Sequence, residues 1–485
     1  MTPRRKRRLG ALLAMLTVPV VAHLVIDRAT RIRAVAVDTP ALEVREQGEL
    51  RRAGPSWTRA VGGLRVTYLA GTPEEIGTAH SRLLYDRMVA DEAIMWDGLD
   101  HVVPFPPARW LLMDVARVKY RGVAAGFPEP RARELAAEAA AFTPDPYTAH
   151  LPTYQRMSYL HALYDIALGF EGSPLVGCTS FALGPTRTRD GHVLVARAFD
   201  FEAADVFDID KTVFVVREAG RIPFLSVSWP GLVGVVTGMN AEGVSLVVHG
   251  ARAGEPSSDG MAIVFSIREA LSQARDAGEA ARILSEQKTM VSHMVLATDA
   301  AGRFVVVERA PGSAAFVRSA GTDTAALTNH LEGPLSGDPK NLRVRDKTTT
   351  LARRARIDEL LSGVAPKSAD VERAVAMLRD HVCAGGEACP PGDRRTIDAF
   401  IATHGFVADL TDRVAWVSSG PHLSGKFTRI DLRATLEHAA DGGDPTAPSE
   451  IAADPALVDG RYEQGRERAG APLFGGDRQK LGGPR

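Results

Sequence analysis

Five short apolar runs between residues 191 and 250 constrain the fold of this chain more than any other feature. Valine, phenylalanine and leucine dominate them, and glycine, proline and charged residues separate them. The runs read GHVLVARAFDF, KTVFVVRE, PFLSVSW, GLVGVVTGMN and GVSLVVHG. Such a pattern is typical of short strands joined by turns. The sequence therefore predicts strands in a meander, with neighbours that run antiparallel.

Helical patterns lie before, between and after these strands. The first opens at Thr72, which suits the N-cap, with Pro73 at the first helical position and Glu75 placed to complete a capping box. This first pattern spans residues 71–96. Further helical patterns cover residues 130–142, 156–168, 261–286, 348–363 and 368–382. A hairpin at 293–310 and strand patterns at 412–432 complete the series, and residues 27–62 suggest a linker and a first strand. Few βαβ signals occur, so the pattern predicts an α+β fold in which helices cover antiparallel sheets.

The N-terminus carries a separate signal. MTPRRKRR is strongly basic, and an apolar run from Leu9 to Ile26 follows it directly. This arrangement is typical of an export signal or a single membrane anchor. Val20, Val21 and Ala22 form an acceptable cleavage site for a signal peptide, so both outcomes stay open. The body is expected outside the cytoplasm, either anchored to the membrane or secreted into the periplasm or medium.

Charge excludes one class of partner. The chain has 58 basic and 59 acidic side chains, a net charge of −1. A protein that binds nucleic acid in general carries a basic excess, so no nucleic-acid partner is expected.

The three cysteines have different contexts. Cys383 and Cys389 lie six positions apart in a loop rich in glycine and proline. In an oxidising compartment they form a plausible disulfide, and their spacing does not suit zinc. Cys178 is then an unpaired thiol in an exported protein, which calls for a chemical explanation.

Several common site motifs are missing from the sequence. It contains no dinucleotide-binding or phosphate-binding glycine loop, no Gly-x-Ser-x-Gly elbow and no His-Glu-x-x-His helix. The thirteen histidines are scattered rather than spaced as metal ligands. Neither a metal nor a cofactor is expected.

Cys178 suits a nucleophile that is created by a cut. If the bond between Gly177 and Cys178 breaks, the new α-amine has a pKa of about 8 and lies within reach of its own thiol. One residue then supplies both nucleophile and base. The uncut chain could make the cut itself, by attack of the thiol on the carbonyl carbon of Gly177, and glycine permits the close approach.

Here the sequence resembles a known family. GCTSFALGPTRTRDGHVLVARAFDF resembles the maturation site of N-terminal-nucleophile hydrolases, and the similarity extends from Thr67 to Leu432. It is greatest to the acyl-coenzyme A:6-aminopenicillanate acyltransferase family, with acid ceramidase, N-acylethanolamine amidase and choloylglycine hydrolase as relatives. The segments AGTPEEIGTAHSRLL, GMNAEGVSL, LTNHL and VAWVSSGPHLSGKFTRIDL match family motifs in the family's order. The resemblance implies a four-layer αββα sandwich of two antiparallel sheets between helices.

The resemblance also implies roles for individual residues. Cys178 matches the nucleophile, and Asp200 matches the acid that holds the free α-amine. Arg197 matches the arginine beside the sulfur. Asn329 matches the side-chain donor of the oxyanion hole. A backbone N–H near His249 would be the second donor, although relatives usually have asparagine there.

Two questions remain open at this level. Relatives often carry another arginine after the oxyanion asparagine, and five candidates compete for it: Arg343, Arg345, Arg353, Arg354 and Arg356. In addition, Arg197 and Asp200 are three positions apart. Side chains three apart on a strand point to opposite faces, so a bulge or turn would be needed for both to reach one site.

The expected protein is a self-processing thiol hydrolase or acyltransferase that cleaves linear N-acyl amides through an acyl-thioester on Cys178. Its regions would be a signal or anchor at 1–33, a mostly helical segment at 34–177, a catalytic segment at 178–440 and a flexible tail at 441–485. The two chains made by the cut would stay associated. The alternatives are a ceramidase-like lipid amide or ester hydrolase, a catalytically silent surface binding protein of the same fold, and a papain-like thiol enzyme. The acyl group, the amine, and the balance of hydrolysis and transfer stay undetermined.

Overall fold

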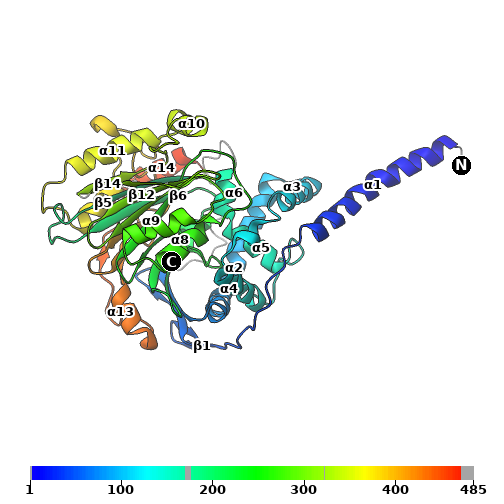
Figure 1. Ribbon diagram of the computed structural model, residues 1–485, viewed down its shortest axis with the longest axis horizontal. Helices are drawn as coiled ribbons and strands as arrows, with labels where there is room; N and C mark the ends of the chain where they lie inside the picture. The colour runs from blue at the N-terminus through cyan, green and yellow to red at the C-terminus, as the bar shows by residue number, and fades with distance from the viewer. Residues whose placement is uncertain (1–2, 170–175, 322, 471–485) are drawn as a thin grey trace.

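The protein is built around two stacked β-sheets with helices on their outer faces. The computed structural model in Figure 1 describes residues 3–169, 176–321 and 323–470. The first sheet has eleven strands in the order β1-β2-β3-β4-β7-β8-β9-β10-β11-β12-β13, and the second has seven in the order β14-β5-β6-β15-β16-β17-β18.

Most strands of the first sheet are the short apolar runs of the sequence. Its strands are β1 Val44–Gln47, β2 Leu50–Ala53, β3 Ser56–Val61, β4 Leu64–Gly71, β7 Thr212–Glu218, β8 Phe224–Ser228, β9 Thr237–Asn240, β10 Val244–Gly250, β11 His293–Asp299, β12 Phe304–Arg309 and β13 Phe316–Ser319. Those of the second sheet are β5 Val176–Leu183, β6 Leu194–Phe201, β14 Thr324–Leu327, β15 Ala402–Asp409, β16 Val414–Ser418, β17 Phe427–Asp431 and β18 Glu450–Ile451.

The helices form the outer layers and the two ends of the molecule. They are α1 Pro3–Ala29, α2 Pro73–Val102, α3 Pro106–Lys119, α4 Glu129–Ala141, α5 Thr153–His161, α6 Leu163–Gly169, α7 Val206–Ile209, α8 Ile263–Leu271, α9 Ala277–Glu286, α10 Pro339–Lys347, α11 Thr350–Ser362, α12 Val371–Leu378, α13 Leu432–Glu437 and α14 Arg461–Ala469. Residues of α2, α4, α8 and α9 pack on the outer face of the first sheet, and α11 and α12 cover the second.

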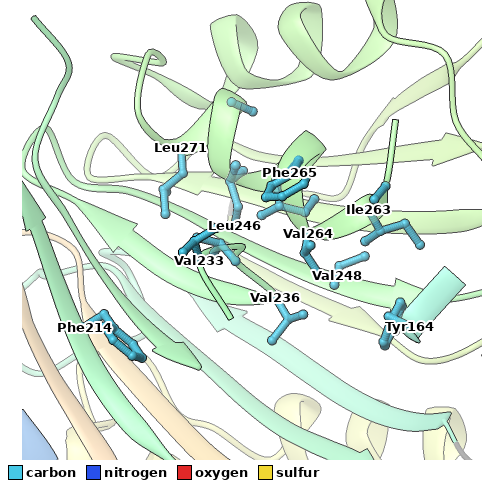
Figure 2. Packing of buried hydrophobic residues seen from close by; sticks show 14 of the residues in the cluster. Tyr164, Phe214, Val233, Val236, Leu246, Val248, Ile263, Val264, Phe265 and Leu271 are labelled. Carbon is cyan, nitrogen blue, oxygen red and sulfur yellow. The ribbon is translucent and has the colours of Figure 1, made fainter. Parts of the chain in front are cut away.

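Three apolar clusters separate the four layers. One lies between the sheets and joins residues such as Val195 and Phe406 of the second sheet to Val247 and Leu296 of the first. The other two lie under the outer helices. Figure 2 shows part of the first outer cluster, where Ile263, Val264 and Phe265 of α8 lie beside Leu246 and Val248 of β10. Burial of these branched side chains is the main stabilising term of such a layered fold.

The predicted α+β class with two stacked sheets between helices is confirmed, with two differences. β4 and β7 pair in parallel, so the first sheet is not purely antiparallel. Residues 27–62, where one strand was expected, contain three, and β4 follows them directly. β1 and β2 escaped prediction because they are short and polar: β1 is the exposed edge strand, and β2 beside it is only half buried.

Helix positions follow the sequence pattern better than helix ends do. Thr72 caps α2 and Glu75 completes the capping box, as predicted. The single helices expected over 156–168 and 261–286 are each divided in two. The second break lies at residues 272–276, where Asp276 caps α9 by accepting from the backbone N–H groups of Gly278 and Glu279.

The two ends of the chain differ in placement. α1 extends away from the sheets at one end of the molecule, with α3 beside its base (Figure 1). Within the described ranges, no helix combines the length and apolar character needed to cross a membrane. At the other end, α14 packs against the main body of the protein, with Gly465 against the ring of Phe400. Residues 471–485 of the predicted tail lie outside the described residues.

Candidate active site

Cys178 lies near the start of β5, opposite Phe199 of β6. The side chains of one strand alternate between faces, so the register decides what each residue meets. Cys178, Arg197 and Phe199 point to the side of the first sheet, whereas Gly177 and Asp200 belong to the face that carries α11. Cys178 is completely buried.

Arg197 contacts the sulfur from the inner face. Its Nη2 lies 3.4 Å from Cys178 Sγ, and its other contacts are to neutral acceptors. Nη1 donates to Thr237 Oγ1 at 2.6 Å and to the carbonyl of Val236, and Nη2 donates to the carbonyl of Val248. Nowhere in the described chain does a carboxylate form an ion pair with Arg197, although the side chain is fully buried. The thiol is therefore the group nearest to this cation that can become negative.

Two opposing effects act on the thiol. Burial raises the pKa of Cys178 above its usual value, and the Arg197 guanidinium partly offsets this by favouring the thiolate. The thiol is thus protonated at neutral pH, and Arg197 is the cation that favours its ionisation.

Asp200 approaches residue 178 from the opposite face. It pairs with Gly177 across the two strands, and a Cβ added at Gly177 would lie 2.8 Å from Asp200 Oδ2. A larger residue at this position would force the carboxyl group of Asp200 to shift. Burial raises the pKa of Asp200 to about 7, and nearby Arg353 opposes that rise. The carboxyl group therefore changes charge near neutral pH, beside the bond between Gly177 and Cys178.

The separation of Arg197 and Asp200 on β6 needs no bend. Arg197 serves the thiol of residue 178 on the inner face, and Asp200 lies beside its backbone on the outer face. A bulge does occur nearby, but on β15, where the register shifts between Ala402 and His404.

Asn329 and Arg353 hold the backbone of Cys178. The backbone N–H of Cys178 donates to Asn329 Oδ1 at 2.8 Å, and Arg353 Nη2 donates to the same oxygen at 3.0 Å. Arg353 Nη1 donates to the carbonyl of Cys178 and, at 2.9 Å, to Thr179 Oγ1. Asn329 Nδ2 donates to the carbonyl of Gly250 at 3.1 Å. The amide donor of Asn329 thus points to the end of β10.

The structure selects one of the five competing arginines. Arg353 is almost fully buried and reaches residue 178 from α11, whereas Arg354 and Arg356 pair with Asp358 and Asp380 on the helix surface. The sequence predicted the helix but not its rotation, which packing against β5 and β14 determines.

The histidines near the site have structural partners. His249 Nε2 lies 2.7 Å from Ser180 Oγ, and burial holds the pKa of His249 well below its usual value. His404 Nε2 contacts Thr237 Oγ1 at 2.9 Å, and His330 Nδ1 contacts Thr350 Oγ1 at 3.1 Å. Neutral imidazoles beside Arg197 add no second charge and orient the hydroxyl groups of its surroundings.

Two cavities flank the Cys178 region. The first, of about 100 Å³, is almost entirely apolar, and its lining includes Tyr164, Phe199 and Trp229. Phe199 is the strand partner of Cys178, so this cavity reaches the thiol side. The second, of about 220 Å³, has a mixed lining of apolar and polar residues, and Gly177, Asp200, Asn329 and Arg353 are among them. Nothing in the sequence indicated that Tyr164 lines a cavity, because residues 156–168 showed only the apolar pattern of a helix.

Two further sequence features are structural. Asn240 turns the hairpin between β9 and β10, since its Oδ1 accepts from the N–H groups of Glu242 and Val244 and Gly243 has a φ of +82°. Cys383 and Cys389 form a disulfide.

Comparison with known proteins supports the resemblance found in the motifs. Residues 186–390 match the family described as Acyl-coenzyme A:6-aminopenicillanic acid acyl-transferase. The match confirms the predicted resemblance over those residues, which include Arg197, Asp200, Asn329 and Arg353. Cys178 lies just before them.

More distant similarities are partial. An uncharacterized protein of Archaeoglobus fulgidus is 27% identical over 130 residues, which is 26% of this chain and 22% of that protein. The solved structure of a Caenorhabditis elegans N-acylethanolamine-hydrolyzing acid amidase ortholog shares 16% identity, covers 48% of this chain and 93% of its own, and gives a TM-score of 0.36. Penicillin V acylase from Agrobacterium tumefaciens shares 16% identity over 52% of this chain and 91% of its own, also at 0.36. A variant of conjugated bile acid hydrolase from Clostridium perfringens shares 12% identity over 57% and 97%, at 0.32.

Proposed function

We propose that the chain is a self-processing thiol amidohydrolase or acyltransferase whose nucleophile is an N-terminal Cys178. The class of enzyme follows from the family match over 186–390. One observation carries the finer proposal: a single residue offers its thiol to Arg197 and its backbone N–H to Asn329, directly after a glycine that lies against Asp200.

The uncut chain would process itself in two steps. The thiolate of Cys178 attacks the carbonyl carbon of Gly177, and the amide nitrogen of Cys178 leaves with a proton, so the peptide bond becomes a thioester. Water then hydrolyses the thioester and releases the carboxyl group of Gly177. Thiol and α-amine of Cys178 are both free afterwards, and no external reactant besides water is consumed.

The processed enzyme would use the same atoms on a substrate. The α-amine takes the thiol proton, the thiolate attacks the N-acyl carbonyl, and the leaving amine takes the proton back. Asp200 would hold the α-amine, and Asn329 Nδ2 would be free to turn from Gly250 towards the developing oxyanion. Water or an amine then receives the acyl group from sulfur.

The direct test is the state of the purified chain. We expect two fragments on a denaturing gel that remain together on size-exclusion chromatography, the larger beginning at Cys178. Brief exposure to an N-acyl substrate followed by acid quenching should place the acyl mass on the Cys178 peptide. A single chain with full amidase activity would rule out self-processing.

The apolar cavity predicts an acyl chain of substantial length. Leu160 and Met95 line the cavity, so Leu160→Trp or Met95→Trp would reduce the space for the chain. Each excluded methylene costs about 0.8 kcal/mol, so kcat/KM for long acyl chains should fall by on the order of tenfold to a hundredfold. Values for acetyl substrates should stay unchanged.

The measurement uses one amine acylated with chains of increasing length. Leu342→Trp is the matched control, because Leu342 is exposed on α10 and does not line the cavity. Equal losses for short and long chains would show that the cavity does not bind the acyl group.

The export of the body, including its orientation outside the cytoplasm, is likewise proposed from the N-terminal sequence and is supported by the Cys383–Cys389 disulfide.

A further inference from the structure

Helix α3 has its polar and apolar faces reversed relative to an ordinary surface helix. Its buried side chains are Asp114 and Arg117. Its exposed side chains are large and apolar: Trp110 is 61% exposed, Leu111 66% and Val115 56%. Helices on the surface of a soluble protein place charge outside and apolar groups inside, because water solvates the charge.

The end of α1 completes the same arrangement. His23 Nδ1 lies 3.0 Å from both carboxylate oxygens of Asp114, and Arg117 Nη2 lies 3.2 Å from Asp27 Oδ1. Polar and charged groups therefore fill the contact between α1 and α3. The outward residues of α1 are apolar: Val18, Val20, Val21, Leu24 and Val25 are each more than half exposed.

A pair of helices with ion pairs inside and apolar side chains outside suits a lipid environment. In hydrocarbon, polar groups must satisfy one another within the protein, and apolar groups meet the acyl chains. In water the same surface would leave an extended apolar patch without cover, and patches of that kind mark interaction sites. Trp110 at the edge of the pair, stacked on His23, has the amphipathic character that the membrane interface favours.

Charge identifies the kind of lipid surface. α1 begins with the basic segment Arg4 to Arg8, five consecutive lysine or arginine residues. Such a cluster beside an apolar helix surface is attracted by anionic headgroups. A protein partner or a second copy of this chain would need an apolar surface complementary to α1 and α3, and such a surface would not account for the basic segment.

We propose that the outer surface of α1 and α3 binds an anionic phospholipid bilayer, with Trp110, Leu111 and Val115 entering the acyl boundary. This goes beyond the proposed catalysis and does not depend on it. Figure 1 shows that the pair projects from one end of the molecule, clear of the two sheets, so contact with a flat surface is sterically open.

Flotation of the full-length protein with vesicles tests the proposal. We expect the protein to float with vesicles of phosphatidylcholine and phosphatidylglycerol, and less so at high salt or with phosphatidylcholine alone. The triple variant Trp110→Glu, Leu111→Glu, Val115→Glu should lower the bound fraction at least tenfold. Trp emission should shift to the blue on vesicles in the wild type, and this shift should be lost in Trp110→Phe.

The matched control introduces the same three charges at exposed apolar residues elsewhere: Val317→Glu, Leu342→Glu and Val458→Glu. This variant should bind vesicles as the wild type does. Circular dichroism and gel filtration of both triple variants verify folding, and Leu111→Glu alone replaces the α3 triple variant if that protein aggregates. Undiminished flotation of the α3 variant would overturn the proposal, since the basic segment would then suffice. A wild-type dimer that the α3 variant dissociates would also overturn it, with a second copy as the occupant.

Discussion

Replacing Cys178 with alanine is expected to yield a single uncut chain without amidase activity. The variant lacks the only thiol near Asn329 and Arg353 in the described site, and nothing else there can carry an acyl group as a thioester. Loss of a covalent nucleophile lowers kcat/KM by on the order of 10⁴-fold or more. Denaturing gels measure cleavage, and release of the amine measures turnover.

Two companion variants make this result specific. Cys178→Ser keeps a nucleophile of higher pKa, so it should cleave slowly and turn over poorly. Cys383→Ala combined with Cys389→Ala removes the disulfide but leaves the Cys178 thiol and its contacting groups in place, so this variant should still process. If Cys178→Ala were cut or active like the wild type, the assignment of Cys178 would be wrong, whatever the state of its fold.

Replacing Arg197 with glutamine is expected to slow self-cleavage strongly at neutral pH. Arg197 is the cation nearest to the sulfur, and an opposite charge at such a distance changes a pKa by about 1–3 units. The Cys178 pKa, already raised by burial, would rise further in the variant. Because the thiolate is the attacking form, its population at pH 7 and the cleavage rate should fall by about tenfold to a thousandfold.

The pH dependence separates this electrostatic role from simple damage. Below its pKa the thiol is protonated, so the cleavage rate of the wild type should rise about tenfold per pH unit from neutral pH upward. In Arg197→Gln the rising limb of the curve of cleavage rate against pH should move to higher pH. The cleavage rates of the variant and the wild type should converge at alkaline pH. Cleavage followed over time after cell-free synthesis gives both curves. A uniformly lower rate with an unmoved limb would indicate that Arg197 only supports the fold.

Arg197→Lys is the conservative control. Lysine keeps the positive charge but cannot reach Thr237, Val236 and Val248 with one planar group. We expect its pH limb to lie close to that of the wild type and its rate to be reduced.

Local sequence chemistry determined much of the fold. The capping box at Thr72, the turn at Asn240 and the alternation of the strands depend on residues within a few positions of one another, so the sequence alone predicted them. The breaks inside 156–168 and 261–286 were missed because the apolar pattern continues through them. The polar strands β1 and β2 were missed for the opposite reason, since pairing with neighbouring strands rather than their own composition makes them strands.

The candidate site was likewise predicted from the sequence only in part. The order of the motifs singled out Cys178, Arg197, Asp200 and Asn329, and period-two alternation correctly separated Arg197 from Asp200. Only the tertiary structure decided that this separation is useful, because the pairing of β5 with β6 brings Arg197 to the thiol and α11 brings Arg353 to the backbone of the same residue. Which of five arginines enters the site depends on the rotation of α11 against β5, and contacts between residues 175 positions apart determine that rotation. Sequence patterns are local and report what each segment prefers, whereas a site assembled from distant segments exists only once packing has fixed their register and orientation.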